Sequence, residues 1–97
     1  MPTTKEYRDY ILEKLSNLTE LRFKPMMGEY LLYYKDILFG GIYDNRLLVK
    51  ITDTNNNLGL EEEYPYPGAK PMFIVSDIDD RERLEKIILL TYNGLIK

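Results

Sequence analysis

The fold is decided by the stretch EYLLYYKDILFGGIYDNRLLVKI, residues 29–51. Two pairs of polar residues, Lys35-Asp36 and Asp44-Asn45, divide it into three runs rich in strand-forming residues. Asp and Asn tolerate the positive φ angles that two-residue hairpin turns require. The stretch therefore predicts a three-stranded antiparallel meander, with strands at 29–34, 37–43 and 46–51.

The region before the meander predicts a helix and one more strand. Helical spacing of apolar residues predicts a helix over about 4–16, with Thr3 as its N-cap and Glu6 reaching back to it. Residues 20–24 alternate between polar and apolar side chains, which predicts a half-buried strand that Pro25 ends.

The region after the meander predicts a short helical turn at 58–63 and a strand at 72–76. Asp79 then begins a cap signature, and a helix is expected to run to about Asn93, with Gly94 at its left-handed C′ position. Because tight turns make neighbouring strands antiparallel, we expect one two-layer α+β domain over residues 1–97. It has an antiparallel sheet of about five strands between two flanking helices, in the order helix, five strands, helix.

Composition limits the chemistry of this 97-residue chain. It contains no cysteine and no histidine, which excludes a thiolate nucleophile, a zinc–thiolate site and a histidine proton shuttle. We predict no catalytic residues, no cofactor and no metal. No apolar run approaches the roughly 18 residues of a membrane span, and the N-terminus carries no signal core, so we expect a cytoplasmic protein with no membrane partner.

Two segments provide a candidate partner surface. Three prolines stiffen residues 64–72, and Pro67-Gly68 predicts a type II turn. Such a connector does not need Tyr64, Tyr66 and Lys70, so these are candidate contacts. The second segment is Met26-Met27-Gly28-Glu29, because methionines adapt to irregular partner surfaces. Glu29 could act as a general base only if burial raised its pKa and an acid lay nearby.

A second candidate surface is basic. Arg22, Lys24, Arg46 and Lys50 can share the exposed sheet face with tyrosines, a combination that stacks bases and holds phosphates. The net charge of −3 favours a solvated face instead, so we do not expect nucleic-acid binding by this chain on its own.

Three further features have a structural and a functional interpretation. The acidic run Asp77, Asp79, Asp80 and Glu82 favours helix capping over a cation site. Gly40-Gly41 favours a bulge, or room for a helix or an aromatic ring packed against the sheet, over a ligand approach. The apolar residues 30–34 and 87–90 exceed what one buried face needs, which leaves open either self-association as a homodimer or deep burial.

Three blocks, at 25–34, 38–44 and 66–72, together resemble the N-terminal domain of the TfoX/Sxy family, and the resemblance covers nearly the whole chain. It implies a small α+β domain with an antiparallel sheet and flanking helices. The family is named for competence regulators that act as positive co-regulators of transcription with the cyclic-AMP receptor protein. Its full-length members carry a second, helical C-terminal domain, which we do not expect within 97 residues.

The resemblance implies no catalytic residues, and the leading hypothesis is a non-enzymatic, regulatory protein-interaction module. Its partner would be the transcription machinery or a transcription regulator. One alternative is a small-molecule-binding protein or enzyme that uses Glu29, Lys50, Lys70 and tyrosines. A second alternative is weak nucleic-acid binding through the exposed sheet face.

Overall fold

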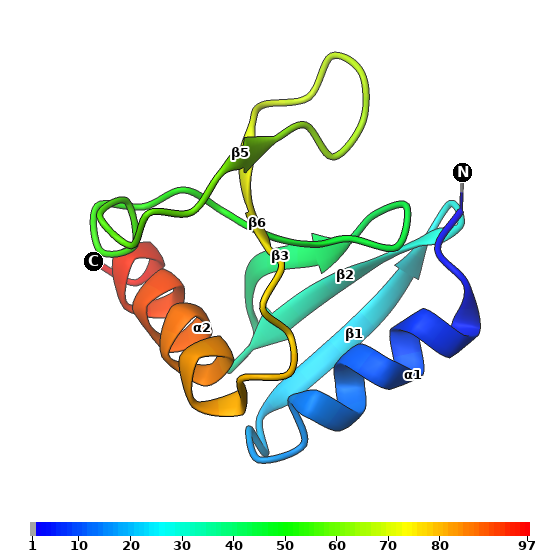
Figure 1. Ribbon diagram of the computed structural model, residues 1–97, viewed down its shortest axis with the longest axis horizontal. Helices are drawn as coiled ribbons and strands as arrows, with labels where there is room; N and C mark the ends of the chain where they lie inside the picture. The colour runs from blue at the N-terminus through cyan, green and yellow to red at the C-terminus, as the bar shows by residue number, and fades with distance from the viewer. Residues whose placement is uncertain (1) are drawn as a thin grey trace.

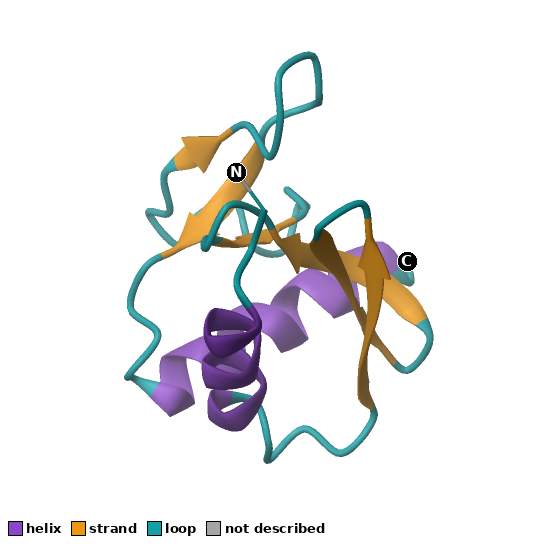
Figure 2. Cartoon of the chain, turned by 90° about the vertical axis from the view of Figure 1, so that its right-hand side faces the viewer, coloured by secondary structure: helices purple, strands orange, loops and turns teal. Residues whose placement is uncertain are grey.

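A computed structural model describes residues 2–97 and confirms the two-layer α+β fold. Six strands form one antiparallel sheet in the order β1-β2-β3-β4-β6-β5, and helices from the two ends of the chain pack against the same side of it (Figures 1 and 2). Neither helix is long and apolar enough, within residues 2–97, to cross a membrane. The elements are α1 (Lys5–Lys14), β1 (Leu21–Met26), β2 (Glu29–Tyr34), β3 (Ile37–Ile42), β4 (Leu47–Val49), β5 (Glu62–Glu63), β6 (Met72–Val75) and α2 (Arg81–Leu95).

Three successive two-residue turns join β1 to β4: Met27-Gly28, Lys35-Asp36 and Asp44-Asn45. All six residues have positive φ angles, between 50° and 86°. Two positive φ angles in a row define the turn whose twist matches that of an antiparallel pair. The two turns predicted from Asp and Asn are confirmed.

β1 continues through Pro25 to Met26, so the predicted strand end at Pro25 is wrong. Met26 and Glu29 face each other across the first turn, and in an antiparallel pair hydrogen-bonded and non-bonded positions alternate. Pro25 therefore occupies a position whose N–H would point away from β2. A proline at such an edge position costs the ladder no hydrogen bond.

The core lies between the sheet and the two helices, and we call this side the helix face. Ile11 of α1 and Leu15, the residue that caps the end of this helix, enter it. The predicted surplus at 87–90 is partly resolved by burial, since Ile87 and Ile88 are buried while Leu89 is exposed. The strand residues of the helix-face core are Tyr30, Leu32, Phe39, Ile42, Leu47, Val49, Phe73 and Val75.

Both helices begin one residue later than the predicted caps. Thr4, not Thr3, accepts the Tyr7 N–H at the start of α1, 3.1 Å away. Asp80, not Asp79, accepts the Arg83 N–H at the start of α2, also at 3.1 Å. The cap signatures located both helices. In each case the predicted cap residue makes a tertiary contact instead, and the next residue, which is of the same type, caps the helix.

Two predictions near the C-terminal half are wrong. The helical turn expected at 58–63 is absent, and Glu62 and Glu63 instead pair with β6 as the edge strand β5. Gly94 lies inside α2 rather than beyond its end. A side chain at Gly94 would collide with Thr52 and Thr54, so this glycine allows the helix to approach the 50–57 loop closely.

A fully buried asparagine fastens the same loop to α2. The side-chain amide of Asn55 donates to the Lys50 carbonyl and to the Thr91 hydroxyl, both at a distance of 2.8 Å. Its side-chain oxygen accepts the Thr52 N–H at 2.8 Å. Thr54 adds a hydroxyl bond to the Leu90 carbonyl. Because buried polar groups must be paired, this cluster fixes both the loop and the backbone of Lys50.

We predict that Asn55→Ala lowers the free energy of unfolding by about 2–4 kcal/mol, because it removes three hydrogen bonds and leaves buried groups unpaired. Urea denaturation followed by circular dichroism measures this. The matched control is the exposed neighbour, Asn56→Ala, which is expected to change stability by less than about 0.5 kcal/mol. Equal effects of the two substitutions would contradict the fastening role.

Candidate binding surface

The segment between β5 and β6, residues 64–71, is called the connector. It projects from the side of the sheet that carries no helix, which we call the open face (Figures 1 and 2). The Ala69 N–H donates to the Tyr66 carbonyl at 3.2 Å, and Gly68 has a φ of 87°. This confirms the type II turn predicted at Pro67-Gly68.

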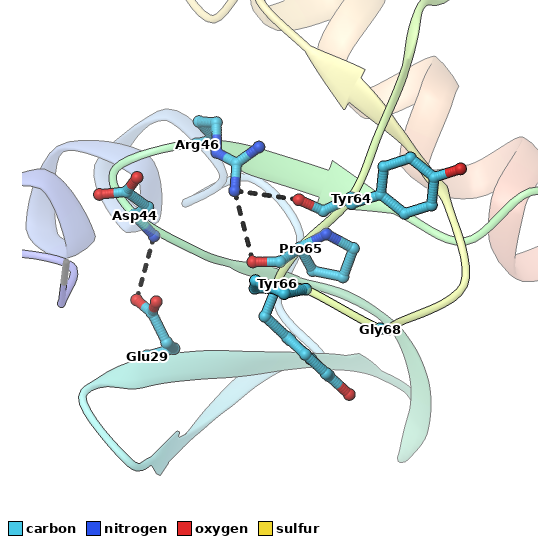
Figure 3. A pocket seen from close by; sticks show the side chains of 8 residues that line it. Glu29, Asp44, Arg46, Tyr64, Pro65, Tyr66 and Gly68 are labelled. Carbon is cyan, nitrogen blue, oxygen red and sulfur yellow. Dashed lines mark hydrogen bonds between the residues drawn. The ribbon is translucent and has the colours of Figure 1, made fainter.

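Arg46 anchors the connector to the sheet (Figure 3). Its guanidinium donates to the carbonyls of Tyr64 at 3.2 Å and Pro65 at 3.4 Å, and to the Glu63 carboxylate at 3.1 Å. Its Nε also donates to the Tyr43 carbonyl at 3.2 Å. Arg46 was predicted as part of a basic face. Its donors instead hold the connector against the start of β4.

Glu29 ties together two hairpin turns and the N-terminal arm. Its Oε1 accepts the Thr3 N–H at 3.0 Å and the Thr3 hydroxyl at 2.7 Å. The same oxygen accepts the Asp44 N–H at 3.1 Å (Figure 3). The Thr3 hydroxyl also accepts the Asn45 N–H at 3.2 Å. This use of Thr3 explains why the cap of α1 moved to Thr4. Glu29 therefore serves as a fastening carboxylate in this structure.

Beside these contacts lies a hollow of about 500 Å³, which we call the Arg46 hollow. It brings together Glu29, Tyr64 and Tyr66 from the predicted partner surface. Met27 stands at the tip of the adjacent turn, two residues from Glu29, and this residue is 97% exposed. Met26 is half-buried on β1 and pairs with Glu29. The hollow is lined by Glu29, Asp44, Arg46, Tyr64, Pro65, Tyr66, Pro67 and Gly68.

Gly41 creates the space in which Tyr43 folds back onto the open face. A Cβ at Gly41 would lie 2.6 Å from the Tyr30 carbonyl oxygen and 2.7 Å from the Tyr43 ring. The Tyr43 ring is buried there, 6.3 Å from the Tyr66 ring between centroids. Burial raises the pKa of the Tyr43 hydroxyl, and Tyr66 and Glu29 raise it further. The predicted room for a packed ring is confirmed, as is a register shift near Gly40.

A second hollow of about 610 Å³ lies on the other side of Tyr66, and we call it the Lys50 hollow. Lys50 and Lys70 both line it. No carboxylate is among its lining residues, so Lys70 does not lie beside an acid that could activate it. Its remaining lining residues are Tyr43, Ile51, Pro65, Tyr66, Ala69, Pro71 and Met72.

The predicted basic face is divided by the structure. Arg22 and Lys24 pair with Tyr33 and Leu31 on the open face, and Arg22 forms an ion pair with Asp36 at 3.5 Å. Lys50 lies just beyond β4, three strands from β1 in the sheet order. At about 4.8 Å per strand, this separates the two groups by roughly 14 Å.

The acidic run before α2 is used in tertiary contacts and capping. Asp79 accepts a hydrogen bond from the Tyr10 hydroxyl at 2.9 Å and pairs with Lys14 at 3.3 Å. These two contacts lower the pKa of the Asp79 carboxyl. Asp80 caps α2. In the part of the chain that the structure describes, no three acidic side chains are arranged to hold a metal ion.

The sequence did not single out Tyr43 or Asp44 for this surface, and it did not indicate the anchoring role of Arg46. Pro65 and Met72 lie within the 64–72 segment that was predicted to belong to it. One signal was available for Tyr43. Gly41 precedes it by two residues, and alternation along a strand places both on the same face. The contacts between 43–50 and 64–72 are tertiary and left no local pattern.

No known protein-family model matches the chain. A comparison with curated proteins finds an uncharacterized 12.7 kDa protein in the trpE 5′ region of Spirochaeta aurantia. It is 30% identical over 98 aligned positions, which cover 98% of this chain and 85% of the relative.

We predict that Met27→Asn raises the free energy of unfolding by about 0.5–1 kcal/mol, because asparagine occupies left-handed backbone at lower cost than methionine. Chemical denaturation measures the gain. Met27→Leu is the control, since leucine keeps the unfavourable backbone and is expected to give no gain. A loss of stability in Met27→Asn, or an equal gain in Met27→Leu, would refute the prediction.

We predict that Gly41→Ala lowers stability by about 2–3 kcal/mol, because its Cβ collides with the Tyr43 ring and the Tyr30 carbonyl. In a Tyr43→Ala background the same change is expected to cost about 1 kcal/mol less, since only the backbone collision remains. Thermal denaturation of the four proteins measures this coupling. Additive effects of the two substitutions would show that the cost of Gly41→Ala does not come from the Tyr43 ring.

Proposed function

We propose that the chain, which belongs to the same family as the Spirochaeta aurantia protein, is a non-enzymatic protein-interaction module that acts in regulation. Its three sequence blocks liken it to the N-terminal domain of TfoX/Sxy competence regulators. Its partner is then a transcription regulator or a component of the transcription machinery, and its place of action is the cytoplasm.

The observation that carries the proposal is Met27. A 97% exposed methionine occupies left-handed backbone, where methionine is disfavoured. Strain and apolar exposure at one residue are both costly, and such residues concentrate at functional sites. Methionine side chains also suit adaptable partner surfaces.

Exposed aromatic rings extend this surface along the connector. Tyr64 is 62% and Tyr66 53% exposed, and both line the Arg46 hollow. Tyrosine supplies large contact areas with few rotatable bonds and is enriched at protein interfaces. Arg46 and the prolines fix the connector beforehand, so a partner would not have to order it.

The placements of the candidate reactive residues favour binding over catalysis. Oε1 of Glu29 accepts three hydrogen bonds, and Lys70 has no carboxylate in its hollow. A nucleophile needs a base within hydrogen-bond reach, and neither residue is placed in such a pair. The nucleic-acid alternative is weakened because Arg46 holds the connector and Lys24 lies far from Lys50.

The proposal predicts a partner that depends on Met27. The full chain is used as bait in cells of its source, and captured proteins are quantified by mass spectrometry for wild type, Met27→Asn and Lys86→Gln. Loss of one interface hot spot of about 1.4 kcal/mol reduces affinity tenfold. We therefore expect Met27→Asn to lower capture of a transcription regulator or polymerase component about tenfold.

Lys86→Gln changes an exposed residue of α2, in the helix layer, and is expected to leave capture unchanged. Because Met27→Asn is expected to be at least as stable as wild type, reduced capture cannot be explained by unfolding. Unchanged capture in Met27→Asn, or a captured set without any transcription component, would refute the proposal.

A further inference from the structure

The Lys50 hollow is positively charged, although the chain as a whole is acidic. The chain carries a net charge of −3, yet this hollow is lined by two lysines and by no acidic residue. Among residues 2–97, neither Lys50 nor Lys70 takes part in an ion pair. Two uncompensated ammonium groups that share one concave site attract anions to it.

The backbone at both lysines is fixed in position. The Lys50 N–H donates to the Phe39 carbonyl at 2.8 Å, and the Lys50 carbonyl accepts from buried Asn55. Lys70 precedes Pro71, which restricts its backbone to extended conformations. Arg46 holds the other end of the connector. A site formed in advance in this way binds with a smaller entropic cost.

The remaining walls are apolar and aromatic. Tyr66 presents a half-exposed ring to the hollow, and Ile51 and Met72 supply aliphatic surface beside it. The volume of about 610 Å³ is in the range of small-molecule sites, roughly 300–1,000 Å³. A flat ring can stack on tyrosine whatever its hydrogen-bonding pattern.

We propose that the Lys50 hollow binds a small aromatic phosphate of the nucleoside monophosphate class. Its phosphate is held by Lys50 and Lys70, and its ring packs on Tyr66. A phosphate monoester carries a charge of about −1.5 to −2 at neutral pH, which matches two lysines better than a single carboxylate does. This site shares Tyr66 with the proposed partner surface but does not include Met27, so nucleotide binding can be tested without the protein partner.

Amide NMR titration of the full chain with AMP and UMP tests the site. We expect saturable shifts at Lys50, Tyr66 and Lys70. Because affinity requires both ring and charge, adenosine alone and inorganic phosphate alone are expected to bind at least about tenfold more weakly. Raising the salt concentration is expected to weaken nucleotide binding, since the lysines act as exposed charges.

Lys50→Gln and Lys70→Gln are each expected to weaken AMP binding about five- to tenfold, which is the loss of a partly exposed charge-assisted contact. Lys86→Gln is the matched control and is expected to change nothing. Met27→Asn is also expected to leave AMP binding intact, so failure of this site and failure of the proposed function are distinguishable.

Three results would overturn the proposal. One is the absence of shifts at the hollow with millimolar AMP and UMP. Another is equal binding of inorganic phosphate and AMP, which would show that the ring is not recognised. The third is tighter binding of a single-stranded oligonucleotide than of AMP at the same residues, which would assign the hollow to nucleic acid.

Discussion

The structure depends on a backbone constraint: the six residues of three successive two-residue turns adopt left-handed conformations. Each pair fixes the register of one hairpin, and in a sheet a one-residue slip would turn every side chain to the opposite face. The separation of the helix-face core from the open face across β1 to β4 therefore rests on these turns. Only one of the six residues is a glycine, so the remaining five carry a conformational cost that the assembled sheet must offset.

The first and third turns lie at the same end of the sheet, and the candidate surface is built there. Glu29 and Thr3 connect those turns, and Arg46 extends the frame to the connector. The connector itself leaves β5 and enters β6 beside Met72, near the far end of β4, and reaches back across the open face. Two hollows form on either side of Tyr66 because this crossing is held at Arg46 and supported by Tyr43.

Local patterns were sufficient to predict the meander, two of its turns, both helices and the Pro67-Gly68 turn. They failed where a residue's role was decided by a distant segment. Thr3 has the chemistry of a cap but hydrogen-bonds Glu29, and Gly94 has the chemistry of a helix terminator but seats the 50–57 loop. β5 has two residues and is a strand only because β6 pairs with it, so no alternation could reveal it. The sequence identified candidate residues that lie on the surface. The two hollows and the anchoring role of Arg46 could be identified only from the tertiary structure.

The two edge strands of the sheet, β5 and β1, differ in length, but both are poor templates for a further strand. At one edge, Glu62 and Glu63 form a strand of two acidic residues, too short and too charged to template another chain. At the other edge, Pro25 has no N–H, and the Leu21 N–H already donates to Leu18. Alternation then leaves Phe23 as the one residue of β1 whose N–H can pair outward. Growth of the sheet by strand addition, and with it fibre-like aggregation, is therefore disfavoured at both ends, and we expect any self-association of this chain to use a face.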